Sequence, residues 1–178
     1  MPEEIEVPTE KLHESIQEEA EKAREKWVLR VALSTAILAV FAAVCSLMAG
    51  HHANEALIEQ IQASDHWAYF QAKGIKAAVL ESKIETLQAL SKQPSVDDEE
   101  KVRRYRKEQQ EIEEQAKEKE KASSVHLTAH NILAKAVTVF QIAIAVSAIS
   151  VLTRRKWLWY GSGVLGLIGL IFLLQELL

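Results

Sequence analysis

Glycine, proline and cysteine are scarce in this sequence of 178 residues, which contains six, three and one of them. The prolines lie at Pro2, Pro8 and Pro94. Because proline is the residue that most strongly interrupts a helix, segments 9–93 and 95–178 can each be mostly helical. The lone cysteine, Cys45, excludes a disulfide bond within one chain.

Two functional classes lack their usual sequence signals. The formal net charge of −4 argues against a nucleic-acid partner, which would require a basic surface. The sequence has no P-loop, no dinucleotide-binding motif and no recognisable pairing of a nucleophile with a base. It therefore predicts a protein without catalytic activity and without an organic cofactor.

Apolar residues are concentrated in three runs, which predict transmembrane helices at 27–50, 131–153 and 157–178. About twenty helical residues cover ~30 Å, the thickness of the hydrocarbon core of a bilayer. A polar amphipathic helix is predicted over 1–26, and its length and acidity favour a retained anchor at 27–50 over a cleaved signal peptide. The predicted fold class is an all-α membrane protein with three transmembrane helices.

Lysine and arginine residues near the span ends predict the orientation in the bilayer. The loop between the second and third spans contains Arg154, Arg155 and Lys156, and basic residues also precede the first span. The segment after the first span has no lysine or arginine until Lys73. By the positive-inside rule, the N-terminus is cytoplasmic, whereas the segment 51–130 and the C-terminus lie on the outer side.

Segment 51–130 is predicted to form a long extramembrane antiparallel helical hairpin with its turn near 93–96. Pro94 ends the first arm, and Ser95 with Asp98 resembles a capping box that starts the second. The second arm is highly charged, which favours a solvated face over a surface that docks on another subunit or a charged partner.

The first arm contains a stripe of apolar or small residues at spacings of three and four. Leu57, Ala68, Val79 and Leu90 are eleven residues apart within it, and Ile61 and Ile75 lie between them. An eleven-residue repeat predicts a nearly straight or slightly right-handed helix pair. The stripe is predicted to pack on the returning arm.

Histidines gather where the hairpin meets the predicted spans. His51 and Glu55 are four residues apart, as are His126 and His130, and His52 is adjacent. Side chains at this spacing project from one helix face, so folding the hairpin can bring the two pairs together as ligands for a divalent metal such as zinc. A proton-sensitive interface and a simple preference of histidine for the headgroup region are the alternatives.

Polar and small residues inside the predicted spans mark candidate pore or helix-contact positions. Lys135, Thr138 and Gln141 recur on one face of the second span. Such residues either line a pore or hydrogen-bond neighbouring helices. Ser162 and Gly166 form a small-xxx-small pair in the third span, which permits close helix packing.

Four stretches of the sequence resemble a family of small bacterial inner-membrane proteins known as domain of unknown function four-three-three-seven. They are "EIEVPTEKLHE", "VALSTAILAV", "HHANEALIEQIQASDHWAYFQAKGIKAAVLE" and "YRKEQQEIEEQAKEKE". The resemblance implies a bacterial inner-membrane location and supplies no activity or site residues.

Three functional hypotheses follow from these features. The first is a structural or interaction protein that forms homo-oligomers and presents the hairpin to a protein partner. The second is an oligomeric channel or transporter whose pore is lined by the second span. The third is a metal or pH sensor that uses the histidine cluster.

Overall fold

The computed structural model describes the backbone of residues 8–177, which form three helices. These are α1 (Pro8–Ala89), α2 (Val96–Thr153) and α3 (Lys156–Leu177). The prediction of an all-helical chain is confirmed for these residues, and each helix is long and apolar enough to cross a membrane. Residues 1–7 of the predicted N-terminal helix, and the side chains of residues 8–16, 19, 20 and 24, lie outside the description.

Helix α1 ends at Ala89, four residues before the predicted end at Gln93, because a C-terminal cap intervenes. Ser91 has a φ of 56°, and the amide of Lys92 donates to the carbonyl of Leu87 at 2.9 Å. These are the marks of a Schellman motif, in which a left-handed residue closes the helix. Arg154 has a φ of 57° and closes α2 in the same way before α3 begins.

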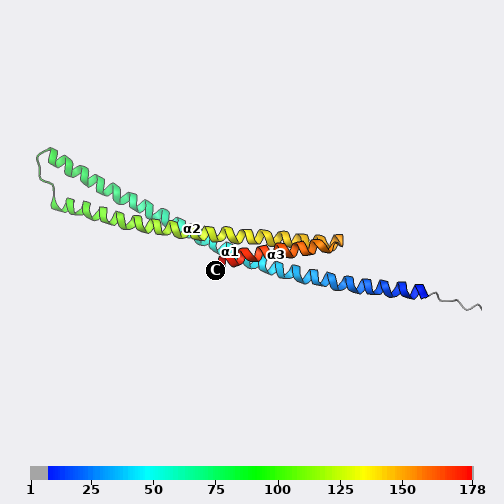
Figure 1. Cartoon of the computed structure of the whole chain (residues 1–178). Coiled ribbons are helices and arrows are strands. Elements are labelled where there is room, and N and C mark those ends of the chain that lie inside the picture. The colour runs from blue at the N-terminus through cyan, green and yellow to red at the C-terminus, as the bar shows by residue number, and fades with distance from the viewer. Residues whose placement is uncertain (1–7, 178) are drawn as a thin grey trace, which may run out of the picture. The chain divides into compact units, whose positions relative to one another are not determined.

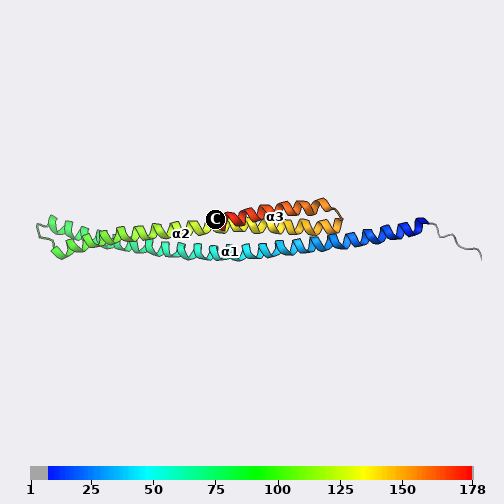
Figure 2. The ribbon, with the colours of Figure 1, turned by 60° about the horizontal axis from the view of Figure 1, so that its bottom comes forward.

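The described chain divides into two compact units. Unit 1 comprises residues up to Leu47 together with Ile132–Leu178, and unit 2 comprises Met48–Asn131. Helices α1 and α2 each run through both units, whereas α3 belongs to unit 1 alone. In unit 1, α3 lies beside α2, and in unit 2 the two long helices lie side by side and are joined by residues 90–95 (Figures 1 and 2).

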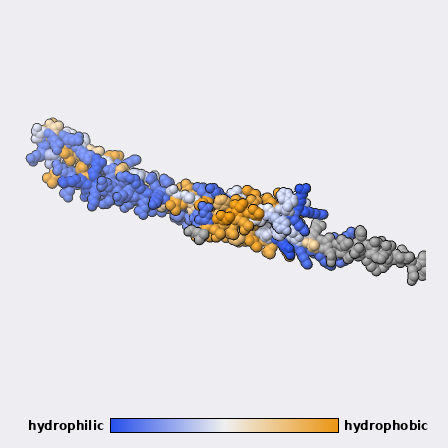
Figure 3. Space-filling view, in the orientation of Figure 1, coloured by the Kyte–Doolittle hydropathy of each residue, from blue (hydrophilic) through white to orange (hydrophobic). Residues whose placement is uncertain are grey.

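The core of unit 1 is built around Phe140, which is 1% exposed. Its ring lies 5.9 Å from that of Phe41 on α1, and Gly169 of α3 leaves the space that the ring fills. Val31, Cys45, Leu133 and Ala143 are also buried. Many large apolar side chains of unit 1 are exposed, and Figure 3 shows hydrophobic residues gathered on the side of unit 1 in view.

In unit 2, the two helices pack through a seven-residue repeat of small residues. Ala49, Ala56, Ala63 and Ala77 are at most 7% exposed, and Phe70 and Ile84 continue the same spacing with partial burial. Ile112 and Ala116 are the buried counterparts on α2. Alanine at the contact lets the two backbones approach closely, which explains why a row of such weakly apolar residues forms the packing surface.

The predicted packing of the eleven-residue stripe on the returning arm is wrong. Leu57, Ile61, Ile75, Val79 and Leu90 are each between 52% and 65% exposed. The stripe lies on a different face of α1 from the alanine repeat. The prediction followed an unbroken line of apolar or small residues, whereas close contact between these helices selects the face on which alanine recurs every seven residues.

Four ion pairs cross between the two helices of unit 2. Glu59 pairs with Lys119 at 3.0 Å, and Lys83 pairs with Asp98 at 2.6 Å. Glu81 accepts two hydrogen bonds from the guanidinium of Arg106, and Lys73 pairs with Glu108. Part of the charged second arm therefore faces α1. Asp98, predicted to serve a capping box, is 7% exposed and points at Lys83 instead.

Candidate functional site

The histidine cluster lies in unit 2, where α1 and α2 meet next to the ends of the apolar runs. His52 on α1 and His126 on α2 place their Nδ1 atoms 3.0 Å apart, with ring centroids 5.3 Å apart. His51 lies beside His52, at a centroid distance of 5.6 Å. One Nδ1 must donate and the other accept, so the contact requires at least one neutral imidazole.

His130 and Ser123 make a second kind of contact, from α2 to the backbone of α1. His130 Nδ1 lies 2.9 Å from the carbonyl oxygen of Ala49, and Ser123 Oγ donates to the carbonyl oxygen of Ala56 at 2.8 Å. A carbonyl oxygen can only accept, so Nδ1 of His130 carries its proton and leaves Nε2 as the basic nitrogen when the ring is neutral. Both acceptors belong to the alanine repeat, where the helices are closest.

Of the five predicted metal ligands, the structure brings His52 and His126 into direct contact. Two nitrogens bound to one tetrahedral zinc lie about 3.3 Å apart, given Zn–N bonds of about 2.0–2.1 Å, so the observed spacing is close to that of a ligand pair. Within the described residues, however, no three side chains of histidine, cysteine, aspartate or glutamate are grouped closely enough to hold an ion. Glu55 is half-buried, and His130 is engaged with the backbone.

A lysine enclosed by two aromatic rings lies further along unit 2, and sequence reasoning did not find it. The side chain of Lys73 is 12% exposed, and its Nζ lies 5.0 Å from the ring centroid of Tyr69 and 5.1 Å from that of Tyr105. Hydrogen bonds with Glu108 and then with Tyr69 raise the pKa of Lys73. The hydrogen bond from Lys73 in turn lowers the pKa of Glu108.

The same region contains the aromatic stretch of α1. Trp67 Nε1 donates to Glu120 on α2 at 2.8 Å, and its indole meets the ring of Phe70 edge-on with centroids 5.4 Å apart. Gln109 donates to the carbonyl oxygen of Phe70 and lies against Gly74. These side chains hold α1 against α2, and we assign them a structural role.

The predicted polar face of α2 is exposed on unit 1. Lys135, Thr138 and Gln141 all lie on the surface, in a helix that is otherwise rich in apolar residues. Thr138 satisfies its hydroxyl by donating to the carbonyl oxygen of Ala134 at 2.9 Å. Gln141 hydrogen-bonds to no other residue that the structure describes. Its amide therefore points outward from the apolar surface without a partner in the described chain.

Ser162 and Gly166 are buried contacts within unit 1. Ser162 is 2% exposed and donates to the carbonyl oxygen of Trp159 at 3.0 Å. A Cβ atom at Gly166 would lie 2.7 Å from Cδ2 of Leu38, so α3 packs against α1 at this position. Both residues serve helix packing inside one chain and are covered by it.

A cluster of hydroxyl groups in unit 1 joins α1 to α2 and α3. Thr35 Oγ1 lies 2.7 Å from Ser147 Oγ, and Trp159 Nε1 donates to Ser34 Oγ at 3.0 Å. Ser147 and Ser150 are fully buried. Serine and threonine recur in the apolar runs, which is the sequence signal for this cluster. Which hydroxyl groups pair across the helices depends on the register of the helices. The cluster is tightly packed and specifies how the helices dock.

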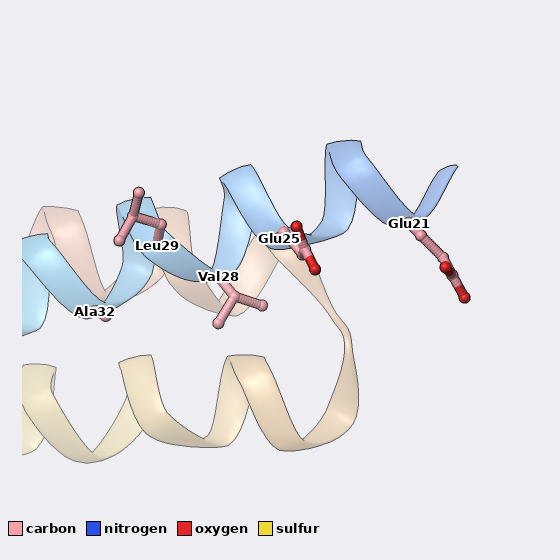
Figure 4. A pocket seen from close by; sticks show the side chains of 5 residues that line it. All are labelled: Glu21, Glu25, Val28, Leu29 and Ala32. Atoms are coloured by element: carbon pink, nitrogen blue, oxygen red, sulfur yellow. The ribbon is translucent and has the colours of Figure 1, made fainter. Parts of the chain in front are cut away.

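A groove of about 620 Å³ runs along the N-terminal part of α1 in unit 1. It is lined by Glu21, Glu25, Val28, Leu29 and Ala32, as Figure 4 shows. All five of these side chains come from α1, and the described lining contains no histidine and no serine, threonine or cysteine.

The family described as domain of unknown function (DUF4337) matches residues 27–178. The chain belongs to this family. The match covers all of unit 2 and unit 1 from residue 27 onward, and it includes the histidine pair and the polar face of α2. No match to the chain was found among curated proteins or among solved structures.

Proposed function

We propose that this chain is a membrane-anchored interaction protein without catalytic activity, and that it works as a homo-oligomer. In this proposal unit 1 is embedded in a bilayer, and the membrane spans are residues 27–50, 131–153 and 157–178, of which the first two extend by a few residues into unit 2. Its apolar outer surface and its three sufficiently long helices support this role. Unit 2, with its charged surface, then stands in water and presents a rigid pair of helices to a protein partner.

The single observation that carries the oligomer is the exposure of Gln141. This residue lies about ten positions from the start of the predicted span, or ~15 Å, close to the centre of a bilayer. Transfer of an amide from water into hydrocarbon, where it finds no hydrogen-bond partner, costs on the order of 4–8 kcal/mol. Contact with the same face of a second copy would let two Gln141 amides bond each other, as polar residues do between membrane helices.

The proposed location is the bacterial inner membrane, with the N-terminus in the cytoplasm and unit 2 and the C-terminus on the periplasmic side. The short basic loop at Arg154–Lys156 supports this orientation, since such loops stay in the cytoplasm. The low content of basic residues directly after the first span supports it as well.

Cysteine cross-linking in native membranes tests the oligomer. In a Cys45→Ala background, Gln141→Cys is oxidised with copper phenanthroline, and a covalent dimer is expected. Leu167→Cys is the matched control, because Leu167 is 63% exposed on α3 but lies on an apolar face that needs no partner. A dimer from both variants, or from neither, would contradict contact through the Gln141 face.

A channel is the second candidate, because the same observation favours it. An exposed line of Lys135, Thr138 and Gln141 could face water in a pore between copies instead of bonding directly. Conductance in planar bilayers separates the two functions. Single-channel currents that change with Gln141→Leu would support the pore, and silence at all voltages with intact cross-linking would support the interaction protein.

A further inference from the structure

The apolar stripe of α1 in unit 2 is largely exposed in the part of the chain that the structure describes. Leu57, Ile61, Ile75 and Val79 are each more than half exposed, and Ser64, Ala68 and Ser82 lie exposed between them. At 100° per residue, the members from Leu57 to Leu90 fall within an arc of about 80°. This face contains no charged residue over more than thirty positions, whereas the side of unit 2 that Figure 3 shows is mostly hydrophilic.

From this face we infer that unit 2 binds a second copy of itself, with the α1 helices parallel and in register. The inference rests on the proposed membrane anchoring. Copies inserted in one bilayer with the same topology have their α1 helices pointing the same way. Because Gly50 marks the end of the apolar run in each copy, Leu57 stands ~10 Å beyond that boundary in both. Membrane anchoring therefore opposes each stripe residue to its own equivalent.

The charges beside the stripe suit this arrangement. One flank carries Gln60, Gln71 and, further along, Glu85, whereas the other carries Asp65, Lys76 and Lys83. Across a two-fold axis between parallel helices, each flank of one copy faces the opposite flank of the other, so Glu85 faces the side that carries Lys83. No like charges meet at the seam. A partner recognised by charge would instead be expected to find a row of one sign beside the stripe.

The alanine repeat and the apolar stripe of α1 also differ in their sequence repeat, as expected if each packs against a different neighbour. The alanine repeat recurs every seven residues and is buried against α2, whereas the stripe recurs every eleven residues and is exposed. An eleven-residue repeat keeps one face of a nearly straight helix turned toward its partner. Small residues between the large ones let two identical stripes interdigitate.

Symmetric cross-linking tests this inference on the full chain in membranes. In the Cys45→Ala background, Leu57→Cys and Val79→Cys are each oxidised alone, and both should form covalent dimers. Lys107→Cys is the control, because its side chain is 79% exposed on α2 and off the stripe. Mixing Leu57→Cys with Val79→Cys should give little of the mixed dimer, which an antiparallel pair would favour.

The outcomes separate the inference from the proposed oligomer. Dimers through Gln141→Cys without dimers through Leu57→Cys or Val79→Cys would overturn the stripe interface and leave the proposed function intact. Equal dimers from Lys107→Cys would show random collision and would also overturn it. As a second measurement, the double substitution Ile61→Glu with Val79→Glu should reduce the yield of the Leu57→Cys dimer at least tenfold. Circular dichroism should show the helicity of the wild type, since both sites are exposed within the chain.

Discussion

His52 on α1 and His126 on α2 share one hydrogen bond between their Nδ1 atoms, at 3.0 Å. The contact joins residues 74 positions apart in the sequence and lies where unit 2 begins. The contact shows the register of the two helices, because Ala49 with His130 and Ala56 with Ser123 follow on either side of it, three or four residues away on each helix.

From this geometry we expect the pair of His52 and His126 in one chain to bind zinc only weakly by itself. Two imidazoles supply half of a tetrahedral ligand set, and the described residues add no third ligand in reach. Calorimetric titration of the purified protein with zinc should show no binding tighter than about micromolar, and His126→Ala with His130→Ala should behave the same. Binding by the wild type that the variant loses would contradict this and would restore the predicted metal site.

Replacing Glu108 with glutamine should destabilise unit 2 in a manner that depends on pH. The pKa of Glu108 is lowered and that of Lys73 is raised, each chiefly by the hydrogen bond between them. The pair therefore stabilises the fold above the unfolded glutamate pKa and below the unfolded lysine pKa, roughly pH 4.5 to 10.5. Its contribution to stability is lost as the pH falls through the lowered pKa of Glu108, or as the pH rises through the raised pKa of Lys73.

Hydrogen exchange of the amides around residues 66–80 measures this effect locally. The protection lost in Glu108→Gln should be constant near neutral pH and should shrink below about pH 4. Glu114→Gln is a suitable control, since Glu114 is exposed on α2 and makes no cross-helix ion pair among the described residues. A difference from wild type that stays the same at pH 3 would show that packing rather than charge is responsible.

Glycine at position 91 should stabilise the chain. Ser91 holds a φ of 56°, which costs a residue with a Cβ atom about 1–2 kcal/mol. Ser91→Gly removes that strain but adds freedom to the unfolded state, so a gain of about 0.5–1 kcal/mol is expected in denaturant unfolding followed by circular dichroism. Ser91→Ala retains the Cβ atom and should bring no gain. Equal effects from alanine and glycine would argue against the cap as described.

Alanine at position 169 should destabilise unit 1, whereas alanine at position 163 should not. The new Cβ at Gly169 would lie 2.9–3.0 Å from the ring of Phe140, which is buried and stacked on Phe41 and cannot retreat. Overpacking of this kind costs about 1–3 kcal/mol. A Cβ at Gly163 meets nothing within 4 Å, so Gly163→Ala is the matched control. Both are compared by unfolding in mixed detergent micelles.

The helical class and the three long apolar helices could be predicted because their signals are strong and local. Few residues interrupt the helices, and apolar runs of this length are unambiguous. The helix end at Ala89 was missed because Ser91 adopts a left-handed conformation that only glycine or asparagine would have signalled. The break therefore came before Pro94, the residue that suggested it.

The packing face of unit 2 could not be predicted by ranking hydrophobicity. Ala56, Ala63 and Ala77 form the contact, whereas the more apolar Leu57 and Val79 stay exposed. Three kinds of contact select the alanine face: close approach of the two backbones, carbonyl acceptors for His130 and Ser123, and ion pairs such as Glu59 with Lys119. These contacts depend on the partner helix and its register, which the sequence of one helix alone does not reveal. The enclosed Lys73 was missed for the same reason, since Tyr105 and Glu108 come from α2.

Native mass spectrometry of the full chain released from lipid nanodiscs tests the central claim most directly. If exposed Gln141 marks an interface between copies, the particle should have a mass that is an integral multiple, two or more, of the 20.0 kDa chain. Gln141→Leu should shift the distribution toward the monomer, because leucine needs no partner in lipid. A wild-type particle of 20.0 kDa at the density that the protein has in native membranes would contradict the account.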